Sequence, residues 1–100
     1  MHVISRKALR DFAERHPTAR GPLDAWYRTA RQATWSNLAD VQATYPHADL
    51  YGACTIFNIG GNNYRLIVWI NYAYQRIFIR NVLTHAGYDR EGWKDDCECD

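Results

Sequence analysis

The sequence predicts an α+β fold in which two N-terminal helices pack on one face of a small antiparallel sheet of three or more strands. Through the first third of the chain, apolar residues recur at three- and four-residue steps, the spacing of one helical face. After residue 50 this spacing is replaced by β-prone runs separated by turn residues. A chain of 100 residues is long enough for one compact core and too short for two, so a single domain over residues 1–100 is expected.

The first helix is predicted from Ser5, a suitable N-cap, to His16, because Pro17 then stops the helix. Its buried stripe is Ala8, Leu9, Phe12 and Ala13. Its polar face carries Arg6, Lys7, Arg10 and Arg15, which is interpreted either as a solvated helix face or as an RNA-facing surface. Spacing alone leaves both interpretations open.

A second helix is predicted to begin near Pro22, which suits a first helical turn, and to end near Trp35 or Ser36. Residues 37–44 are expected to add one or two further helical turns. The Tyr45-Pro46 step closes them, because a residue before proline favours an extended backbone.

Three strands in an antiparallel meander are predicted for the second half of the chain. The predicted strands are Ala53–Ile59, Tyr64–Asn71 and Arg76–Leu83, with turns at Gly60–Asn63 and Tyr72–Gln75. The Gly60-Gly61 pair lacks the lysine of a phosphate-binding loop, so a hairpin is the preferred interpretation.

Side-chain alternation predicts which face of each strand is buried. In the middle strand the face of Tyr64, Leu66, Val68 and Ile70 is the core candidate, opposite Arg65, Ile67, Trp69 and Asn71. In the third strand the same alternation places one set of side chains on one face and a second set on the other. The two sets are Ile77, Ile79, Asn81 and Leu83, and Arg76, Phe78, Arg80 and Val82. Arg65 and Arg80 are therefore expected to project toward one functional face.

Composition places the chain among folded globular proteins, since 47% of its residues are hydrophobic. No run approaches the roughly 20 apolar residues that span a bilayer, and the first residues lack the apolar core of a signal peptide, so the cytoplasm is the expected location. The cysteine count of three is odd and shows no framework spacing. Cys54, Cys97 and Cys99 are accordingly expected to be reduced thiols.

The net charge of +1 hides an asymmetry, because four of the eleven acidic residues lie in the last six positions. Residues 1–94 carry 12 basic and 7 acidic residues, which is compatible with binding a phosphate backbone but weak evidence for it. Residues 95–100 are expected to be a flexible acidic tail. The four histidines are scattered without paired-ligand spacing, and two thiols in Cys97-Glu98-Cys99 are too few for a site, so no metal is expected.

The densest group of reactive side chains is Thr84–Asp89, which follows the third strand. Metal-free RNA cleavage needs a group that takes the 2′-oxygen's proton, a cation near the phosphate and a proton for the departing 5′-oxygen. His85 can exchange protons near neutral pH, arginine matches phosphate oxygens, and Tyr88 can orient the nucleophile or stack a base. The structural alternative is that His85 and Tyr88 end the strand and that Asp89 caps a helix over residues 90–94.

Three blocks, taken in order, resemble the HigB toxin family, and the similarity extends to about Lys94. They are Met1–Leu9, Phe57–Leu66, and Phe78–His85 continued by Tyr88-Asp89.

The resemblance implies a RelE-like fold and a type II toxin that cleaves messenger RNA without a metal, typically on the ribosome, by attack of the 2′-hydroxyl on the phosphodiester. It implies no cofactor. It also implies a partner antitoxin of the HigA type, a helix-turn-helix protein, and contact with operon DNA only through the complex with that antitoxin.

Carried over to this sequence, the resemblance makes His85, Arg65, Tyr88 and Asp89 the candidate catalytic residues. The candidate RNA-binding residues are Arg80 of the third strand and Lys7 and Arg6 of the first helix. The acidic tail departs from the basic ends common among RelE-like toxins, so no RNA or ribosome contact is assigned to it. The alternative function is a non-catalytic module that uses the same basic face to bind RNA or a protein.

Overall fold

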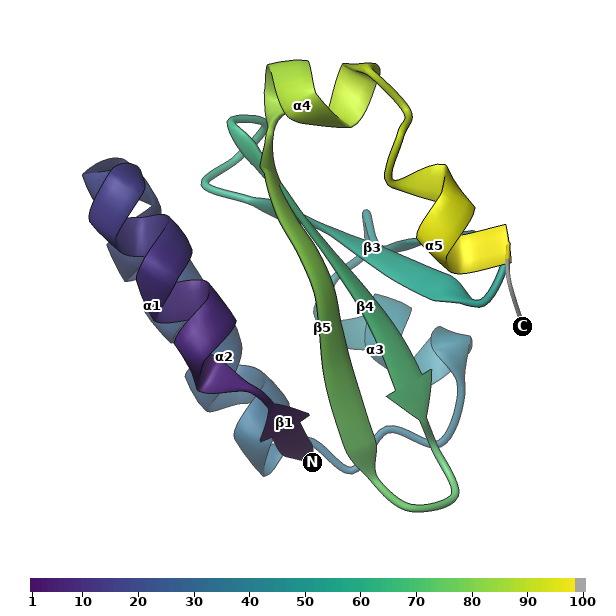
Figure 1. Cartoon of the computed structure of the whole chain (residues 1–100). Coiled ribbons are helices and arrows are strands. Elements are labelled where there is room, and N and C mark those ends of the chain that lie inside the picture. Colours follow the sequence, from purple (N-terminus) through teal and green to yellow (C-terminus); the bar gives the residue numbers. More distant parts are fainter. Residues whose placement is uncertain (99–100) are drawn as a thin grey trace.

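A computed structural model describes residues 1–98 of the chain (Figure 1). The elements in chain order are β1 (His2–Ile4), α1 (Arg6–Arg15), a 3₁₀ turn (Pro17–Ala19), α2 (Arg20–Gln32), α3 (Leu38–Thr44), β2 (Asp49–Tyr51), β3 (Cys54–Ile59), β4 (Tyr64–Asn71), β5 (Arg76–Thr84), α4 (His85–Asp89) and α5 (Lys94–Glu98). The α+β class and the two leading helices are confirmed.

The sheet has five strands in the order β1-β5-β4-β3-β2. The predicted meander of β3, β4 and β5 is confirmed, and all its pairings are antiparallel. Two short edge strands were not predicted. β1 pairs in parallel with the start of β5, and β2 pairs antiparallel with β3. Each is three residues long, too short for a period-two pattern to emerge.

Helices α1 and α2 pack side by side over one face of the sheet (Figure 1). Their buried residues are Leu9, Phe12 and Ala13 from α1, as predicted, and Leu23, Trp26 and Ala30 from α2. Ser5 occupies the N-cap position of α1 without a side-chain cap bond. Helix α2 ends at Gln32 rather than near Trp35, because Trp35 leaves the helix and stacks on Phe57 in the core.

The main hydrophobic core lies between these helices and the sheet. It includes Leu66, Val68 and Ile70 with Tyr64 packed against them, so the predicted core face of β4 is confirmed. A second, smaller core lies on the other face of the sheet and consists of Cys54, Ile56, Ile67, Trp93 and Cys97. Both faces of β4 therefore bury apolar side chains.

A β-bulge in β5 makes the predicted alternation of that strand wrong. Ile67 pairs with Asn81 while Val68 pairs with Ile79, so Arg80 is an extra residue in β5. Beyond the bulge the faces exchange: Ile79 and Val82 both pack against the main core, whereas Leu83 packs against the second core. A one-residue insertion shifts every later side chain to the other face.

The C-terminal segment also differs from prediction. Residues 94–98 form α5, and Cys97 is buried and disulfide-bonded to Cys54 of β3. The reduced state predicted for Cys54 and Cys97 is therefore wrong, and so is the flexible tail as far as Glu98. Both corrections have one cause, because α5 folds back over the second core, where the two cysteines meet. Cys99 and Asp100 lie outside the described residues, and so do the predictions made for them.

Candidate active site at helix α4

Helix α4 begins where β5 ends because Thr84 caps it. The Thr84 hydroxyl accepts a hydrogen bond of 3.1 Å from the backbone N–H of Gly87, which satisfies a free donor of the first turn. The backbone N–H of His85 donates to the carbonyl of Asn63 at 3.1 Å. The first residue of α4 is thus anchored to the β3–β4 hairpin.

His85 and Asp89 form a pair on the exposed side of α4. Histidine Nδ1 lies 3.4 Å from the Asp89 carboxylate, and the two side chains are 51% and 62% exposed. The separation of four residues places both on one face of a helix. Asp89 is the last residue of α4, so the alternative in which it caps a helix over residues 90–94 is wrong.

Arg65 is buried behind this helix with only 8% of its surface exposed. Its Nη1 donates to the carbonyls of Asn62 and Tyr64 at 3.2 and 3.1 Å, and its Nη2 donates to the side-chain oxygen of Asn62 at 2.6 Å. A guanidinium has five N–H donors, so these bonds use three of them. The hairpin therefore holds a permanent positive charge in a fixed position.

Three side chains form a stack that joins Arg65 to the C-terminal segment. The guanidinium carbon of Arg65 lies 5.1 Å from the centre of the Tyr88 ring. Tyr88 stacks in turn on Trp93, with ring centres 5.0 Å apart and an angle of 11° between the planes. The Trp93 indole N–H also donates to the Tyr88 carbonyl at 2.9 Å. Both rings are thereby held in place.

Helix α5 supports the outer side of this stack. The Tyr51 ring meets Trp93 edge-on at 5.4 Å, and the Tyr51 hydroxyl donates a hydrogen bond to the Glu98 carboxylate. That bond favours the protonated phenol and raises the pKa of Tyr51. Lys94 lies 4.9 Å from the centre of the Tyr51 ring, and its hydrogen bond to Glu91 raises the pKa of the Lys94 ammonium.

The structure brings together four of the seven predicted site residues. His85, Tyr88 and Asp89 share α4, and Arg65 lies against Tyr88. Arg80 is exposed at the bulge and has different neighbours, since it lines one cavity with Trp69 and Phe78 and another with residues of α1. The structure does not place Arg80 among the contacts of Arg65 and Tyr88, and its role in binding RNA stays a prediction.

Lys7 and Arg6 lie at the start of α1, on the helical layer, and both have partners there. Lys7 bonds Asp11 at 2.7 Å, and the Arg6 guanidinium lies 4.6 Å from the centre of the Tyr27 ring. The Lys7 ammonium lowers the pKa of the Asp11 carboxyl through that bond. This arrangement agrees with the interpretation of these cations as a solvated helix face.

Sequence reasoning missed three residues that build the site: Asn62, Thr84 as the cap, and Trp93. The sequence pattern indicates only a turn at Asn62. Trp93 was the one large apolar side chain in an otherwise polar C-terminal segment, and that isolation was the available signal. Its contact with Tyr88 depends on how the chain folds back after α4.

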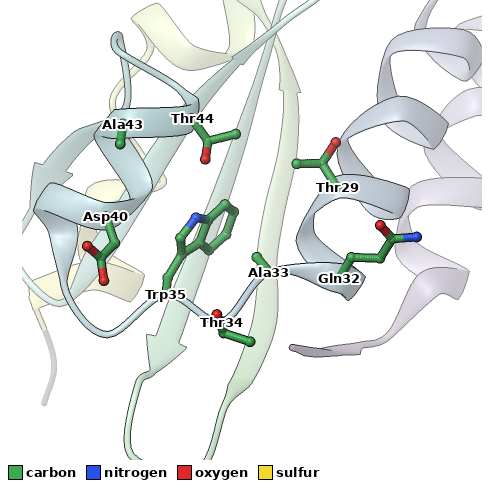
Figure 2. Close-up of a pocket in the computed structure, with 8 residues that line it drawn as sticks. All are labelled: Thr29, Gln32, Ala33, Thr34, Trp35, Asp40, Ala43 and Thr44. Carbon is green, nitrogen blue, oxygen red and sulfur yellow. The ribbon is translucent and has the colours of Figure 1, made fainter.

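A separate cavity lies between the end of α2 and α3 (Figure 2). It has a volume of about 570 Å³ and is bordered by Thr29, Gln32, Trp35, Asp40 and Thr44. The Asp40 carboxylate already accepts a bond of 2.9 Å from the backbone N–H of Ser36. The cavity contains no predicted site residue.

Within residues 1–98, no three histidine, cysteine or acidic side chains are placed to hold a metal ion together. Over the same residues, no helix has the length and apolar character needed to cross a bilayer.

Comparison with known proteins gives consistent matches. Residues 19–91 match the family described as HigB_toxin, the RelE-like toxic component of a toxin-antitoxin system. The mRNA interferase toxin HigB of Escherichia coli K12 is 33% identical over 92 residues, which cover 89% of this chain and 88% of that protein. The mRNA interferase HigB of Escherichia coli O6:H1 is 28% identical over 93 residues, 90% of each chain. A Shigella flexneri mRNA interferase HigB matches at 33% identity.

Proposed function

The chain belongs to the HigB family of RelE-like toxins, and on that basis we propose that it is an endoribonuclease that cleaves messenger RNA. The relatives named mRNA interferase support this assignment along nearly the whole chain. The observation that carries it is the exposed His85–Asp89 pair beside the Arg65–Tyr88 stack. A proton-transfer group there lies next to a fixed positive charge, as metal-free phosphodiester cleavage requires.

His85 is the general base of the proposed reaction. When Nδ1–H points at the Asp89 carboxylate 3.4 Å away, the lone pair of Nε2 is left free to accept a proton. The imidazole takes the proton of the 2′-hydroxyl, the 2′-oxygen attacks the adjacent phosphorus, and the bond to the 5′-oxygen breaks. The products are a 2′,3′-cyclic phosphate and a 5′-hydroxyl that leaves with a proton from solvent. Asp89 is a positioning residue in this scheme.

Arg65 and Tyr88 have separate tasks. Tyr88 is half-buried with one face on Trp93, so its accessible edge and hydroxyl are available to orient an RNA base or the nucleophile. Arg65 lies behind Tyr88 and supplies positive potential where charge develops on the phosphate. Because Asn62 and Tyr64 hold its guanidinium, this charge needs no rearrangement during the reaction.

The exposed cations bind the RNA backbone outside the reacting phosphate. Arg80 is assigned the larger contribution, because it is exposed at the bulge. Lys7 and Arg6 contribute less, since each already contacts a partner on the helical layer.

We further propose a HigA-type helix-turn-helix antitoxin as the partner that restrains the enzyme, with operon DNA contacted only through that complex. Tight binding of such a partner lowers the free enzyme and stabilises the fold by mass action. The substrate is messenger RNA on the ribosome in the cytoplasm, and the whole chain acts as one domain.

The test is to induce the protein without an antitoxin and to map the 5′ ends of messages. Wild type is expected to produce new ends, and His85→Ala is expected to reduce cleavage about 10²- to 10⁴-fold, the usual contribution of a general base. His47→Ala is the matched control, because His47 is also exposed but lies in the loop before β2. Growth arrest with intact messages would show that the enzyme assignment is wrong.

The same experiment distinguishes the alternative, a non-catalytic module that binds RNA or protein through its basic face. The His85→Ala variant of such a module would still arrest growth, whereas the charge-reversed variant Arg80→Glu would not.

A further inference from the structure

Trp69 and Phe78 form an aromatic pair on the sheet face opposite α1 and α2. They are direct partners across β4 and β5, with ring centres 5.2 Å apart and an angle of 31° between the planes. β4 is regular between Arg65 and Trp69 in its pairing with β3, so both residues lie on the same face. The pair therefore lies on the same face of the sheet as Arg65, with Ile67 and the second core between them.

This pair belongs to neither hydrophobic core. The main core lies on the opposite face, and the second core, with the residues packed against it, includes neither ring. Both side chains are half-buried, and each contacts the other. Two large adjacent rings outside any core are typical of a binding surface rather than of a structural one.

Two arginines lie on this side of the sheet near the pair. A cavity of about 480 Å³ is lined by both rings, by Arg80 and by Ile4 and Ser5 at the end of β1. Arg76, exposed, precedes Phe78 by two residues and so lies on the same face. Two acidic groups near Arg80 already have partners: Asp96 accepts a hydrogen bond of 3.1 Å from Asn81, and Asp11, which lines a cavity with Arg80, bonds Lys7. Aromatic rings beside arginines are the combination that binds single-stranded nucleic acid.

We propose that Trp69 and Phe78 form a stacking platform for an unpaired base of the RNA substrate, with Arg80 binding the adjoining phosphate. The proposal rests on the function proposed above and adds a second contact to it. Arg65, which lies behind α4, and Trp69 are four strand residues apart, or about 13 Å, so one RNA strand is long enough to span from α4 to the aromatic pair. An unpaired base is required because stacking needs a free base face, which a duplex does not offer.

Binding of a fluorescent 2′-O-methyl oligoadenylate tests this platform. The probe has no 2′-hydroxyl, so binding is measured without cleavage. The double variant Trp69→Leu/Phe78→Leu keeps apolar bulk and is expected to lose roughly 5- to 150-fold in affinity, the loss typical of removing a stacked base. Arg80→Gln is expected to lower affinity and to reduce the salt dependence of binding by about one counterion.

Two control variants test whether the aromatic rings of Trp69 and Phe78 are themselves responsible for binding. Trp69→Phe keeps an aromatic face and is expected to bind within about threefold of wild type, since stacking tolerates any π-face. Tyr74→Leu removes an aromatic ring that is 75% exposed in the β4–β5 turn and is expected to leave affinity unchanged. Circular dichroism of each variant verifies the fold.

The outcomes separate this proposal from the proposed function. If the double variant binds the probe like wild type, if wild type does not bind it, or if duplex RNA binds equally well, the platform is wrong even though message cleavage can persist. If binding depends on the rings while wild type cleaves no message, the platform stands and the nuclease assignment fails. If the double variant keeps RNA affinity but abolishes self-association or antitoxin binding, the face is a protein interface and the proposal is overturned.

Discussion

At the scale of single residues, the site depends on a buried arginine with fixed partners. Arg65 is 8% exposed and bonds Asn62 through both the backbone and the side chain. Leaving a buried charge without its acceptor costs more than the bond itself contributes, because the charge is already removed from water. Asn62 therefore matters through Arg65 rather than through any contact with substrate.

We expect Asn62→Ala to lower the free energy of unfolding by about 1.5–3 kcal/mol, the usual size of a hydrogen bond to a charged group. Urea denaturation followed by tryptophan fluorescence measures the change. Asn63→Ala is the control, because the hydrogen bonds described for Asn63 use its backbone. If Asn62→Ala and Asn63→Ala lowered the free energy of unfolding equally, the Asn62 side chain would not be what holds Arg65.

At the scale of elements, α4 and α5 act as a pair joined by the Tyr88–Trp93 stack. Neither is longer than five residues, and isolated helices of that length are unstable in water. Their stability comes from tertiary contacts: the Thr84 cap, the anchor to Asn63, and the attachment of α5 through Tyr51 and Cys97.

The attachment of α5 is expected to weaken at alkaline pH. The Glu98 carboxylate raises the pKa of Tyr51 above its ordinary value of 10.0. A group whose folded pKa is raised stabilises the fold fully below its unfolded pKa and loses that contribution as pH rises through the folded pKa. Stability should therefore fall above about pH 10.

Tyr51→Phe removes this contribution, so its unfolding midpoint in urea should depend less on pH above 10 than that of wild type. The raised pKa of Lys94 acts in the same direction but is common to both proteins, so it largely cancels in the comparison. Tyr74→Phe, in the exposed turn, should behave as wild type does. If the unfolding midpoints of wild type and Tyr51→Phe changed with pH in the same way, the proposed role of the Tyr51–Glu98 hydrogen bond would be contradicted.

At the scale of the whole molecule, the disulfide joins two parts of the chain that no local pattern connects. Cys54 and Cys97 are 43 residues apart in sequence, and their bond ties α5 to β3 beneath the active-site stack. Closing a loop of that size restricts the unfolded chain, which stabilises the fold by up to about 4 kcal/mol in the chain-entropy description.

Reduction, or Cys54→Ala, is expected to lower the free energy of unfolding by about 2–4 kcal/mol. The measurement is urea denaturation of oxidised and reduced protein in a Cys99→Ser background, which leaves two cysteines to follow. Thiol titration in denaturant without reductant is the accompanying check. Two free thiols in that titration would show that the bond is absent in the purified protein.

Much of the fold could be predicted because local patterns specify it. Helix α1, strands β3 and β4 with their hairpin, and the core face of Leu66, Val68 and Ile70 follow from apolar periodicity and turn residues. The catalytic candidates of α4 came from three reactive residues close in sequence, combined with a family resemblance that the comparisons confirmed. Their roles in catalysis stay predictions.

The structural features of residues 1–98 thus fall into two groups: those that the sequence determined by itself and those that only the tertiary structure decided. The sequence determined the fold class, the order of its main elements and the family, because each depends on neighbours two to four residues away or on ordered motifs. The tertiary structure decided the bulge at Arg80, the Cys54–Cys97 bond and the stack of Arg65, Tyr88 and Trp93. These depend on strand register and on the return of α5 over the sheet, and packing of the whole chain selects both.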